Sequence, residues 1–353
     1  MEIELQILDP QTLNLCPQGP VILKEAPEEL RPFLKPEAYQ SMIELVTPIC
    51  RNVKEVEDFL REYIRRLEKI AAKNKALIFA ASLHPFAQAK EQKIWEKKRY
   101  QRIFEELQLV GRRFIAQGLH IHLGMPSGES ALKVYRGLRP YLPLLLALST
   151  SSPFYEGHPT GFHSYRSKLF EVLPLAGLPR DFSTWQELEG LISKLKDLGI
   201  ITDVCDLWWD LRIQPALGTV EIRIYDVPGR LKEITALVAL TQALGHYLLT
   251  GPAPTKPPEQ ELILYGKWQA ARYGVKGRFI DPLSGQCISF TQGLRRLLEW
   301  LKESTKALGL THYLQELSPL LTQGPSSTKI YMQHQKGRDL KTIVRDLKAQ
   351  FWS

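Results

Sequence analysis

The stretch "GLHIHLGM", residues 118–125, is the segment from which the fold can be predicted, because it spaces two histidines two positions apart. In a β-strand successive side chains point to opposite faces, so His120 and His122 share one face and three apolar side chains share the other. The apolar face predicts packing on a core. A single His-x-His strand is more often a half-exposed edge than a binding site, so its meaning depends on the other strands.

Two segments near the start of the chain show the same alternation. "MEIELQIL", residues 1–8, places Glu2 and Glu4 on one face and aliphatic side chains on the other. "MIELVT", residues 42–47, holds the single carboxylate of Glu44 among apolar neighbours. Strict period-2 alternation is typical of strands with one polar and one buried face.

Two later segments place arginine beside acid. "DLWWDLRI", residues 206–213, predicts a polar face with these members: Asp206, Trp208, Asp210 and Arg212. "TVEIRIYD", residues 219–226, predicts another: Glu221, Arg223 and Tyr225. The short turn at 215–218 between them indicates a hairpin. Exposed strand faces usually mix Lys, Thr, Ser and Gln, whereas these collect carboxylates, imidazoles and guanidiniums, so we expect a shared functional surface.

The composition is that of an ordinary globular protein. The chain has 353 residues, of which 44% are hydrophobic and 24% charged, with a formal net charge of +8. Its basic residues alternate with acids on amphipathic helical segments, which is typical of solvated helix faces and could attract an anionic substrate such as a nucleotide. No RNP, zinc-finger or basic-arm pattern occurs, so we do not expect nucleic-acid binding.

The cysteines and the apolar runs indicate the compartment. Cys16, Cys50, Cys205 and Cys287 are far apart and form no C-x-x-C pair, which is typical of free thiols in a reducing environment. No signal peptide precedes the first acidic strand, and the most apolar run is far shorter than the ~20 residues that cross a bilayer. We therefore expect a cytoplasmic protein without a membrane segment.

Helical periodicity fills most of the remaining chain. We expect helices over 52–73, with Asn52 as N-cap, and over 91–117, ending at Gly118. Another helix should begin after Ser127 and bend at Pro140 or Pro143, and a further one should be capped by Ser183 and Gln186. The remaining expected helices are 230–250, 291–307 and 338–351. Antiparallel strands separated by long helices predict an α+β fold. We expect one catalytic domain over 1–353, with 258–353 as an alternative helical subdomain after a Pro-rich linker at 251–260.

The polar strand faces favour a particular chemistry. Carboxylates from several strands together with an imidazole suit Mg²⁺ or Mn²⁺. Neighbouring arginines suit phosphate or carboxylate groups, because the planar guanidinium binds them through two points. This combination indicates phosphoryl transfer from ATP. The chain contains neither a P-loop nor the kinase signature set.

Several long motifs together resemble the type 2 glutamate–cysteine ligase family, also called carboxylate–amine ligases. They are "GLHIHLGM", "LRPYLPLLLALSTSSPF", "TGFHSYRSKL", "DLWWDLRIQP" and "GTVEIRIYDVP", with support from "MEIELQILDPQT", "SMIELVTPIC", "LHPFA" and "WQAARYG". The resemblance covers nearly the whole chain in the order of the family. It implies a glutamine-synthetase-like fold, in which helices surround an antiparallel active-site sheet.

The resemblance also implies an activity and a set of site residues. ATP and Mg²⁺ would support phosphorylation of the γ-carboxylate of glutamate, and the amine of cysteine or another amino acid would displace the phosphate. The implied metal ligands are Glu2, Glu4, Glu44, His120 and Glu221. The implied contacts to nucleotide, phosphate or substrate are His122, Arg166, Arg212, Arg223 and Arg272. Of these, Arg272, like His84, could equally be a structural hydrogen-bonder. We expect a homodimer.

Three positions depart from the family pattern. Gln214 stands where the family usually has histidine, Gly266 where it has asparagine, and Lys329 where it has arginine. None belongs to the implied metal set, but all bear on the second substrate and the level of activity.

Two alternatives from other functional classes stay open. A metal-dependent amide hydrolase would also use His-x-His with acids, although no βα-barrel alternation is visible. A catalytically inactive family member would bind ligands without turnover, and the Gln214 departure keeps this hypothesis open.

Overall fold

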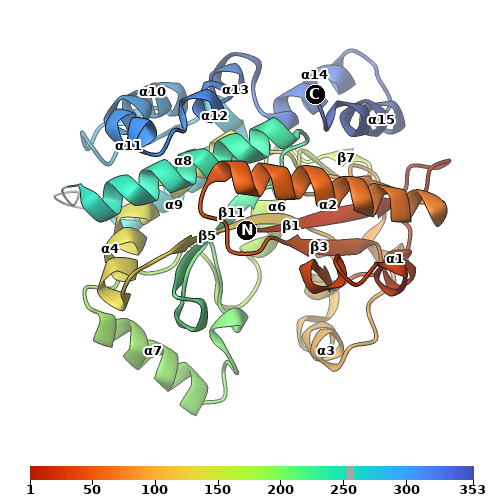
Figure 1. The fold of residues 1–353 in the computed structure, drawn as a ribbon, viewed down its shortest axis with the longest axis horizontal. Coiled ribbons are helices and arrows are strands. Elements are labelled where there is room, and N and C mark those ends of the chain that lie inside the picture. The colour runs from red at the N-terminus through yellow and green to blue at the C-terminus, as the bar shows by residue number, and fades with distance from the viewer. Residues whose placement is uncertain (252–257) are drawn as a thin grey trace.

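A computed structural model describes residues 1–251 and 258–353 of the chain (Figure 1). Within these residues, seven strands form the main sheet in the order β10-β11-β5-β1-β3-β2, and β4 also pairs with β1. The strands are β1 (Glu2–Leu8), β2 (Leu34–Pro36), β3 (Met42–Val46), β4 (Leu77–Phe79), β5 (Gly118–Gly124), β10 (Leu211–Gln214) and β11 (Thr219–Asp226). Every pairing in this sheet is antiparallel.

The register of these pairings aligns the polar faces that the sequence predicts. Glu2 lies opposite His120, and Glu4 lies opposite Glu44. On the other side of β5, His122 lies opposite Glu221. The predicted hairpin between β10 and β11 is confirmed. One face of the sheet therefore carries a continuous row of ionisable side chains.

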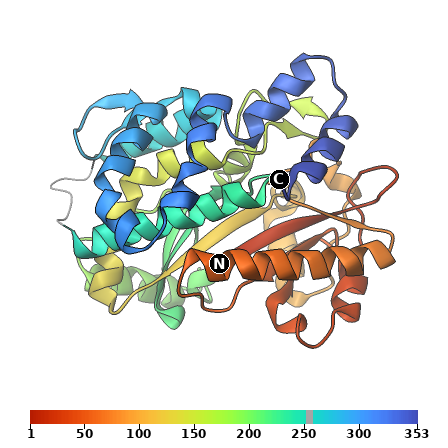
Figure 2. The same ribbon diagram turned by 45° about the horizontal axis from the view of Figure 1, so that its top comes forward.

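The opposite face of the sheet packs on two long helices, α2 (Val53–Lys73) and α8 (Leu231–Thr250), as Figures 1 and 2 show. Ile3 and Leu119 are completely buried in this layer. The apolar core continues into α4 (Gly128–Leu138) and α5 (Leu142–Ser149). In Figure 1, α3 (Lys98–Arg112) and α7 (Trp185–Asp197) lie on the other side of the sheet, where the row of ionisable side chains lies.

The C-terminal part of the chain adds a further helical layer beyond α8 (Figures 1 and 2). Its elements are α9 (Gln260–Tyr273), β12 (Arg278–Ile280), β13 (Cys287–Ser289), α10 (Phe290–Trp300), α11 (Lys302–Ala307), α12 (Thr311–Gln315), α13 (Ser318–Gln323), α14 (Ser326–Gln335) and α15 (Leu340–Gln350). The main apolar core contains residues from both 1–251 and 258–353. Most of the predicted linker, 252–257, lies outside the described residues.

Short elements complete the fold. They are α1 (Gly19–Glu25), β6 (Phe154–Tyr155), β7 (His158–Pro159), α6 (Tyr165–Phe170), β8 (Ala176–Gly177) and β9 (Trp208–Trp209). Among the described helices, none has the length and apolar character that crossing a bilayer requires.

Several local predictions are confirmed and others are wrong. Asn52 caps α2 by accepting from Glu55 N, and a 3₁₀ turn at Arg139–Tyr141 separates α4 from α5 as the prolines predict. The helix predicted over 91–117 is wrong at both ends: α3 begins only at Lys98, and after Arg113 the chain is extended and Ala116 bridges to Leu83. Gly118 therefore opens β5 and caps no helix. The cap predicted at Ser183 is also wrong: the Thr184 side chain accepts from Glu187 N.

Two of the predicted polar strand faces are interrupted. A β-bulge lies between Ile222 and Tyr225, where two residues of β11 oppose one residue of β5. The bulge moves Tyr225 to the buried face, where its hydroxyl lies 2.8 Å from Thr241 Oγ1 of α8. The prediction that Tyr225 shares the polar face with Glu221 is therefore wrong. Likewise, the single strand predicted over 206–213 is wrong: Asp206 lies in a 3₁₀ turn and Asp210 separates β9 from β10.

Candidate active site

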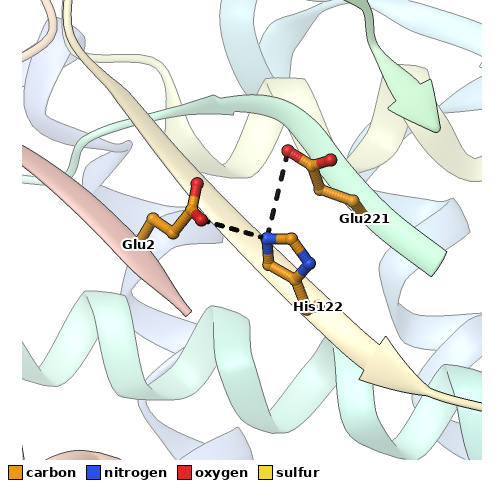
Figure 3. A group of neighbouring side chains, drawn as sticks. All are labelled: Glu2, His122 and Glu221. Atoms are coloured by element: carbon orange, nitrogen blue, oxygen red, sulfur yellow. Dashed lines mark ion pairs between the residues drawn. The ribbon is translucent and has the colours of Figure 1, made fainter. Parts of the chain in front are cut away.

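Three strands bring Glu2, His122 and Glu221 together on the polar face of the sheet (Figure 3). His122 Nε2 lies 3.6 Å from Glu2 Oε1 and 4.0 Å from Glu221 Oε1. The other ring nitrogen, Nδ1, lies 3.1 Å from Thr219 Oγ1. In the described structure Nε2 is buried without a hydrogen-bond partner. A buried nitrogen that faces two carboxylates in this way is suited to bind a cation between them.

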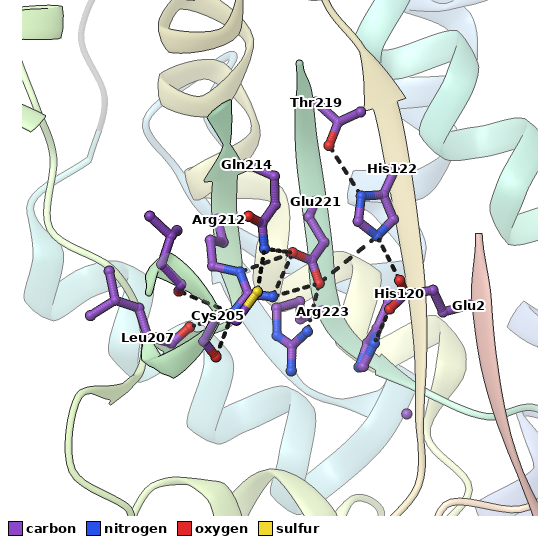
Figure 4. A network of polar contacts seen from close by, with 12 residues as sticks. Glu2, His120, His122, Cys205, Leu207, Arg212, Gln214, Thr219, Glu221 and Arg223 are labelled. Carbon is purple, nitrogen blue, oxygen red and sulfur yellow. Dashed lines mark hydrogen bonds and ion pairs between the residues drawn. The ribbon is translucent and has the colours of Figure 1, made fainter. Parts of the chain in front are cut away.

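Glu221 is held from three directions (Figure 4). Arg212 Nε donates to Oε2 at 2.9 Å, Gln214 Nε2 donates to the same oxygen at 3.2 Å, and Arg223 Nη1 donates to Oε1 at 2.5 Å. Burial alone would raise the pKa of Glu221, but the charges of Arg223 and Arg212 lower it to about 2. The carboxylate is therefore ionised across the physiological range.

Arg212 has little capacity left for a substrate. Its Nη2 contacts Glu221 Oε2 at 2.8 Å, and its Nη1 donates to the carbonyls of Val204, Cys205 and Leu207. The side chain is buried within the wall of the site. These contacts are those of a residue that positions Glu221, which differs from the phosphate or substrate contact that the sequence predicts.

The imidazole of His120 lies between the carboxylates of Glu2 and Glu4. Its Nδ1 lies 3.3 Å from Glu2 Oε2, and its Nε2 lies 3.9 Å from Glu4 Oε1. Burial, followed by the charge of Arg223, lowers the pKa of His120 to about 4, so the imidazole is neutral at neutral pH. Burial opposes ionisation of Glu2, but the neighbouring imidazoles of His120, at 3.3 Å, and His122, at 3.6 Å, hold its pKa well below the ordinary value. An ionised carboxylate and a neutral imidazole are the protonation states that metal ligation requires.

A second group of carboxylates consists of Glu4, Glu37 and Glu44, whose oxygens lie within 4.8 Å of one another. Burial, and then the charge of Glu44, raises the pKa of Glu4 to about 7. Burial likewise raises the pKa values of Glu37 and Glu44, although Lys35 lies 3.4 Å from Glu44. Clustered buried carboxylates are stabilised either by protons or by a hard cation, so this group could hold a second cation.

Glu37 is the member of this group that the sequence did not predict. It follows β2 in an irregular segment, "LKPEAY", where no period-2 alternation marks which side chains share a face. The only available signal was an acid directly after a short strand that pairs with the strand of Glu44. That signal is too common to identify a site.

Arg166 lies at the edge of the second group. It is 3% exposed, and its Nη2 donates to Arg223 O at 3.3 Å while its Nη1 lies 3.9 Å from Asp226 Oδ1. In the described structure its Nε is buried without a partner. Asp226 in turn accepts from the hydroxyls of Ser152 and Ser164. A buried guanidinium with a free donor beside Glu4 and Arg223 is placed to bind an anionic substrate group.

Two candidates from the sequence lie apart from these groups. Arg272 contacts Gly161 O and lies over the rings of Phe162 and Tyr273, and within the described residues it contacts none of the site carboxylates. The predicted nucleotide contact by Arg272 is therefore not supported by this arrangement. His84 is buried, and its Nε2 lies 2.8 Å from Leu13 O, so this nitrogen makes a hydrogen bond to the scaffold.

The remaining departures from the family pattern have local explanations. Gly266 lies where an added Cβ would meet Pro143 and Phe279 at 3.1 Å, so α9 packs on α5 too closely for asparagine without rearrangement. Lys329 Nζ lies 2.8 Å from Glu233 Oε1, so Lys329 forms an ion pair with a buried glutamate of α8.

These features define an α+β protein with a cation-binding candidate site on an antiparallel sheet. The chain belongs to the glutamate–cysteine ligase family 2, whose family model matches residues 1–346. A relative from Gloeobacter violaceus named "Putative glutamate–cysteine ligase 2" is 35% identical over 99% of this chain and 95% of its own length. A relative of the same name from Bdellovibrio bacteriovorus is 38% identical over 90% of this chain and 84% of its own length.

Solved structures confirm the predicted fold class, α+β with helices around an antiparallel sheet. Glutamate–cysteine ligase from Francisella tularensis in complex with AMP matches with a TM-score of 0.73 at 14% identity, over 100% of this chain and 88% of that one. A bifunctional glutathione synthetase from Pasteurella multocida matches with a TM-score of 0.68 at 15% identity, over 99% of this chain and 52% of that one.

Proposed function

We propose that the protein is an ATP- and Mg²⁺-dependent ligase that joins the γ-carboxylate of glutamate to the amine of a second amino acid, with cysteine as the first candidate. ATP phosphorylates the γ-carboxylate, which releases ADP. The amine then attacks the acyl phosphate, the carbon–oxygen bond to phosphate breaks, and inorganic phosphate leaves. The observation that carries this proposal is His122 Nε2, buried and unpaired between the carboxylates of Glu2 and Glu221 beside Arg223.

The donor set fits Mg²⁺ or Mn²⁺. Glu2, Glu221 and a histidine would hold one cation, and Glu4, Glu37 and Glu44 would hold another. When bound, these cations neutralise the charge of the triphosphate. Carboxylates with few nitrogen ligands are typical of hard cations that keep part of their coordination for water and phosphate. Either histidine can supply this nitrogen, because the Nε2 atoms of His120 and His122 are both buried without a partner in the described structure.

The three arginines of the site would have different roles in binding the substrates and positioning Glu221. Arg223 uses Nη1 for Glu221, and in the described part of the chain its Nη2 has no hydrogen-bond partner, so it keeps a donor for a phosphate oxygen. Such a preorganised cation stabilises the charge that develops on the transferred phosphoryl group. Arg166 would bind the carboxylate of the amino-acid substrate, and Arg212 would hold Glu221 in place.

A screen of amino-acid pairs tests the proposal. Purified protein with ATP and Mg²⁺ is incubated with glutamate and each candidate amine, and both ADP and the mass of the ligated product are measured. We expect stoichiometric ADP and γ-glutamyl product with cysteine or a related amine. Hydrolysis of amides without ATP would instead support a metal-dependent amide hydrolase, and ligand binding without turnover would support an inactive family member.

We further propose that residues 1–353 act as one catalytic unit, which the shared core on both sides of 252–257 supports. The homodimer, the cytoplasmic location and the absence of nucleic-acid binding stay predictions from the sequence.

A further inference from the structure

A second cavity lies among the C-terminal helices, away from the candidate active site. Its volume is about 930 Å³, it is open to solvent, and it is lined by residues of α10, α13, α14 and α15, of the 3₁₀ turn Gly274–Lys276, and by Arg230 directly before α8. Figures 1 and 2 show these C-terminal helices beyond α8, on the side away from the main sheet. The cavity shares no lining residue with the candidate active site. Its size is within the range of small-molecule binding sites.

The charge of this cavity is strongly one-sided. Arg230, Lys276, Lys329 and Lys336 line it, and no aspartate or glutamate does so within the described residues. Glu233 balances Lys329 at 2.8 Å. The other three cations make no ion pair in the described part of the chain, and Arg230 Nη2 donates to the hydroxyl of Ser353, which also lines the cavity, at 3.0 Å. A concave surface with about three uncompensated positive charges attracts a multiply charged anion.

Unsatisfied polar groups and helix ends add to this preference. Arg230 Nε is buried without a hydrogen-bond partner in the described structure, and so is Gln333 Oε1, whose amide can reverse to donate. The first residues of α10 and α14 line the same cavity, with the hydroxyls of Thr291 and Thr328. Helix N-termini and hydroxyls are frequent contacts of phosphate oxygens. Phosphate is therefore favoured over a single carboxylate.

Three of the side chains that line the cavity are apolar, and together they are called its apolar wall. They are Val275, Leu321 and Met332, and Met332 is 49% exposed although it is a large hydrophobic residue. An inorganic ion would leave this wall and most of the volume unused. We propose that the cavity binds a phosphorylated small molecule of nucleotide size, with its phosphates at Arg230, Lys276 and Lys336 and its body against the apolar wall. This proposal does not depend on the proposed ligase activity.

Calorimetric titration of the metal-free protein in EDTA at low ionic strength tests the proposal, with ADP and inorganic pyrophosphate as probes. We expect ADP to bind more tightly than pyrophosphate, and the variant Lys276→Glu/Lys336→Glu to weaken both by at least about tenfold. The control Lys302→Glu/Lys341→Glu makes the same charge change on α11 and α15, outside the cavity, and should leave both affinities within about twofold. If the reversed pair fails to fold, Lys276→Gln/Lys336→Gln replaces it.

The candidate active site could also bind ADP, so the titration is repeated with Arg223→Gln, which removes the phosphate donor proposed there. Persistence of the ADP affinity in that variant supports the second cavity, and its loss overturns the proposal. Equal weakening by the cavity variant and the control overturns it as well. So does pyrophosphate binding as tight as that of ADP, or binding of a short single-stranded RNA when neither small probe binds.

Discussion

Arg212 and Glu221 lie directly opposite each other on β10 and β11, and two nitrogens of the guanidinium contact the carboxylate. Both side chains are almost completely buried, with relative exposures of 5% and 1%. The remaining nitrogen of Arg212 donates to backbone carbonyls of the preceding 3₁₀ turn. A single side chain therefore joins the turn at 204–207 to the carboxylate at the centre of the candidate site.

Arg212→Lys should destabilise the protein. Lysine keeps the charge but cannot reach two carboxylate oxygens and three carbonyls together, so buried acceptors lose their partners. We expect the free energy of unfolding to fall by about 3 kcal/mol, as for other broken buried ion pairs, and urea denaturation measures it. Wild-type stability with strongly reduced turnover would show instead that Arg212 contacts substrate.

Arg223→Lys, in contrast to Arg212→Lys, should leave the stability of the protein unchanged and lower its turnover. Lysine can keep an ion pair with Glu221, so we expect the melting temperature to stay within about 2 °C of wild type. Turnover should fall, by up to roughly 10³-fold, if the planar guanidinium stabilises the transferred phosphoryl group. A thermal melt beside a rate measurement decides the matter: a lower melting temperature with normal turnover of the folded fraction would assign Arg223 to the scaffold.

Glu2→Gln tests the cation site with less effect on stability than Glu221→Gln would have. Its neighbours His120 and His122 can stay neutral, whereas Glu221→Gln would leave Arg212 and Arg223 buried without their counter-charge and cost about 3 kcal/mol. We expect Glu2→Gln to weaken Mg²⁺ and Mn²⁺ binding by at least about tenfold in calorimetry, with the fold preserved.

The matched control is Glu303→Gln, which changes an exposed acid on α11 in the same way. Unchanged cation affinity in Glu2→Gln would remove Glu2 from the ligand set.

The second carboxylate group should give the metal-free protein a characteristic pH dependence. Because burial raises the pKa of Glu4 from 4.5 to about 7, the folded protein loses stability as the pH rises through this interval. Glu4→Gln removes that loss, so in EDTA its gain in melting temperature over wild type should be larger at pH 8 than at pH 5, by at least about 2 °C.

At pH 8, saturating Mg²⁺ should make the melting temperature of Glu4→Gln lower than that of wild type. In wild type the ionised carboxylate then has a cation beside it, whereas the amide of the variant does not. A pH-independent difference between Glu4→Gln and wild type would show that Glu4 does not titrate in this range.

The sequence predicts the row of donors because strand periodicity is a local property. Glu2, Glu4, His120, His122 and Glu221 each follow strict alternation, and the structure brings all of them to one face. Tyr225 does not lie on this face, because the bulge adds one residue to β11 and so reverses which side chains point to each face after it. Nothing within the strand sequence marks the position of the bulge.

The limits of prediction elsewhere have a similar cause. The role of Arg212 depends on three carbonyls of a turn whose path the residues of β10 do not encode. The helix predicted up to 117 ends at Arg112, because pairing of Ala116 with Leu83 outweighs local helical preference. Glu37 depends on pairing of the short strand β2, which is likewise a tertiary contact.

The register of β1, β5 and β11 has a consequence for folding kinetics. Glu2 meets His120 across 118 positions of the chain, and His122 meets Thr219 across another 97. Contacts of such high sequence separation form late and slowly, after the loops between them have closed. Recovery of cation affinity during refolding would therefore report the assembly of the central strands, and a ribosome-bound chain that ends before β11 would lack this affinity even with α2 already formed.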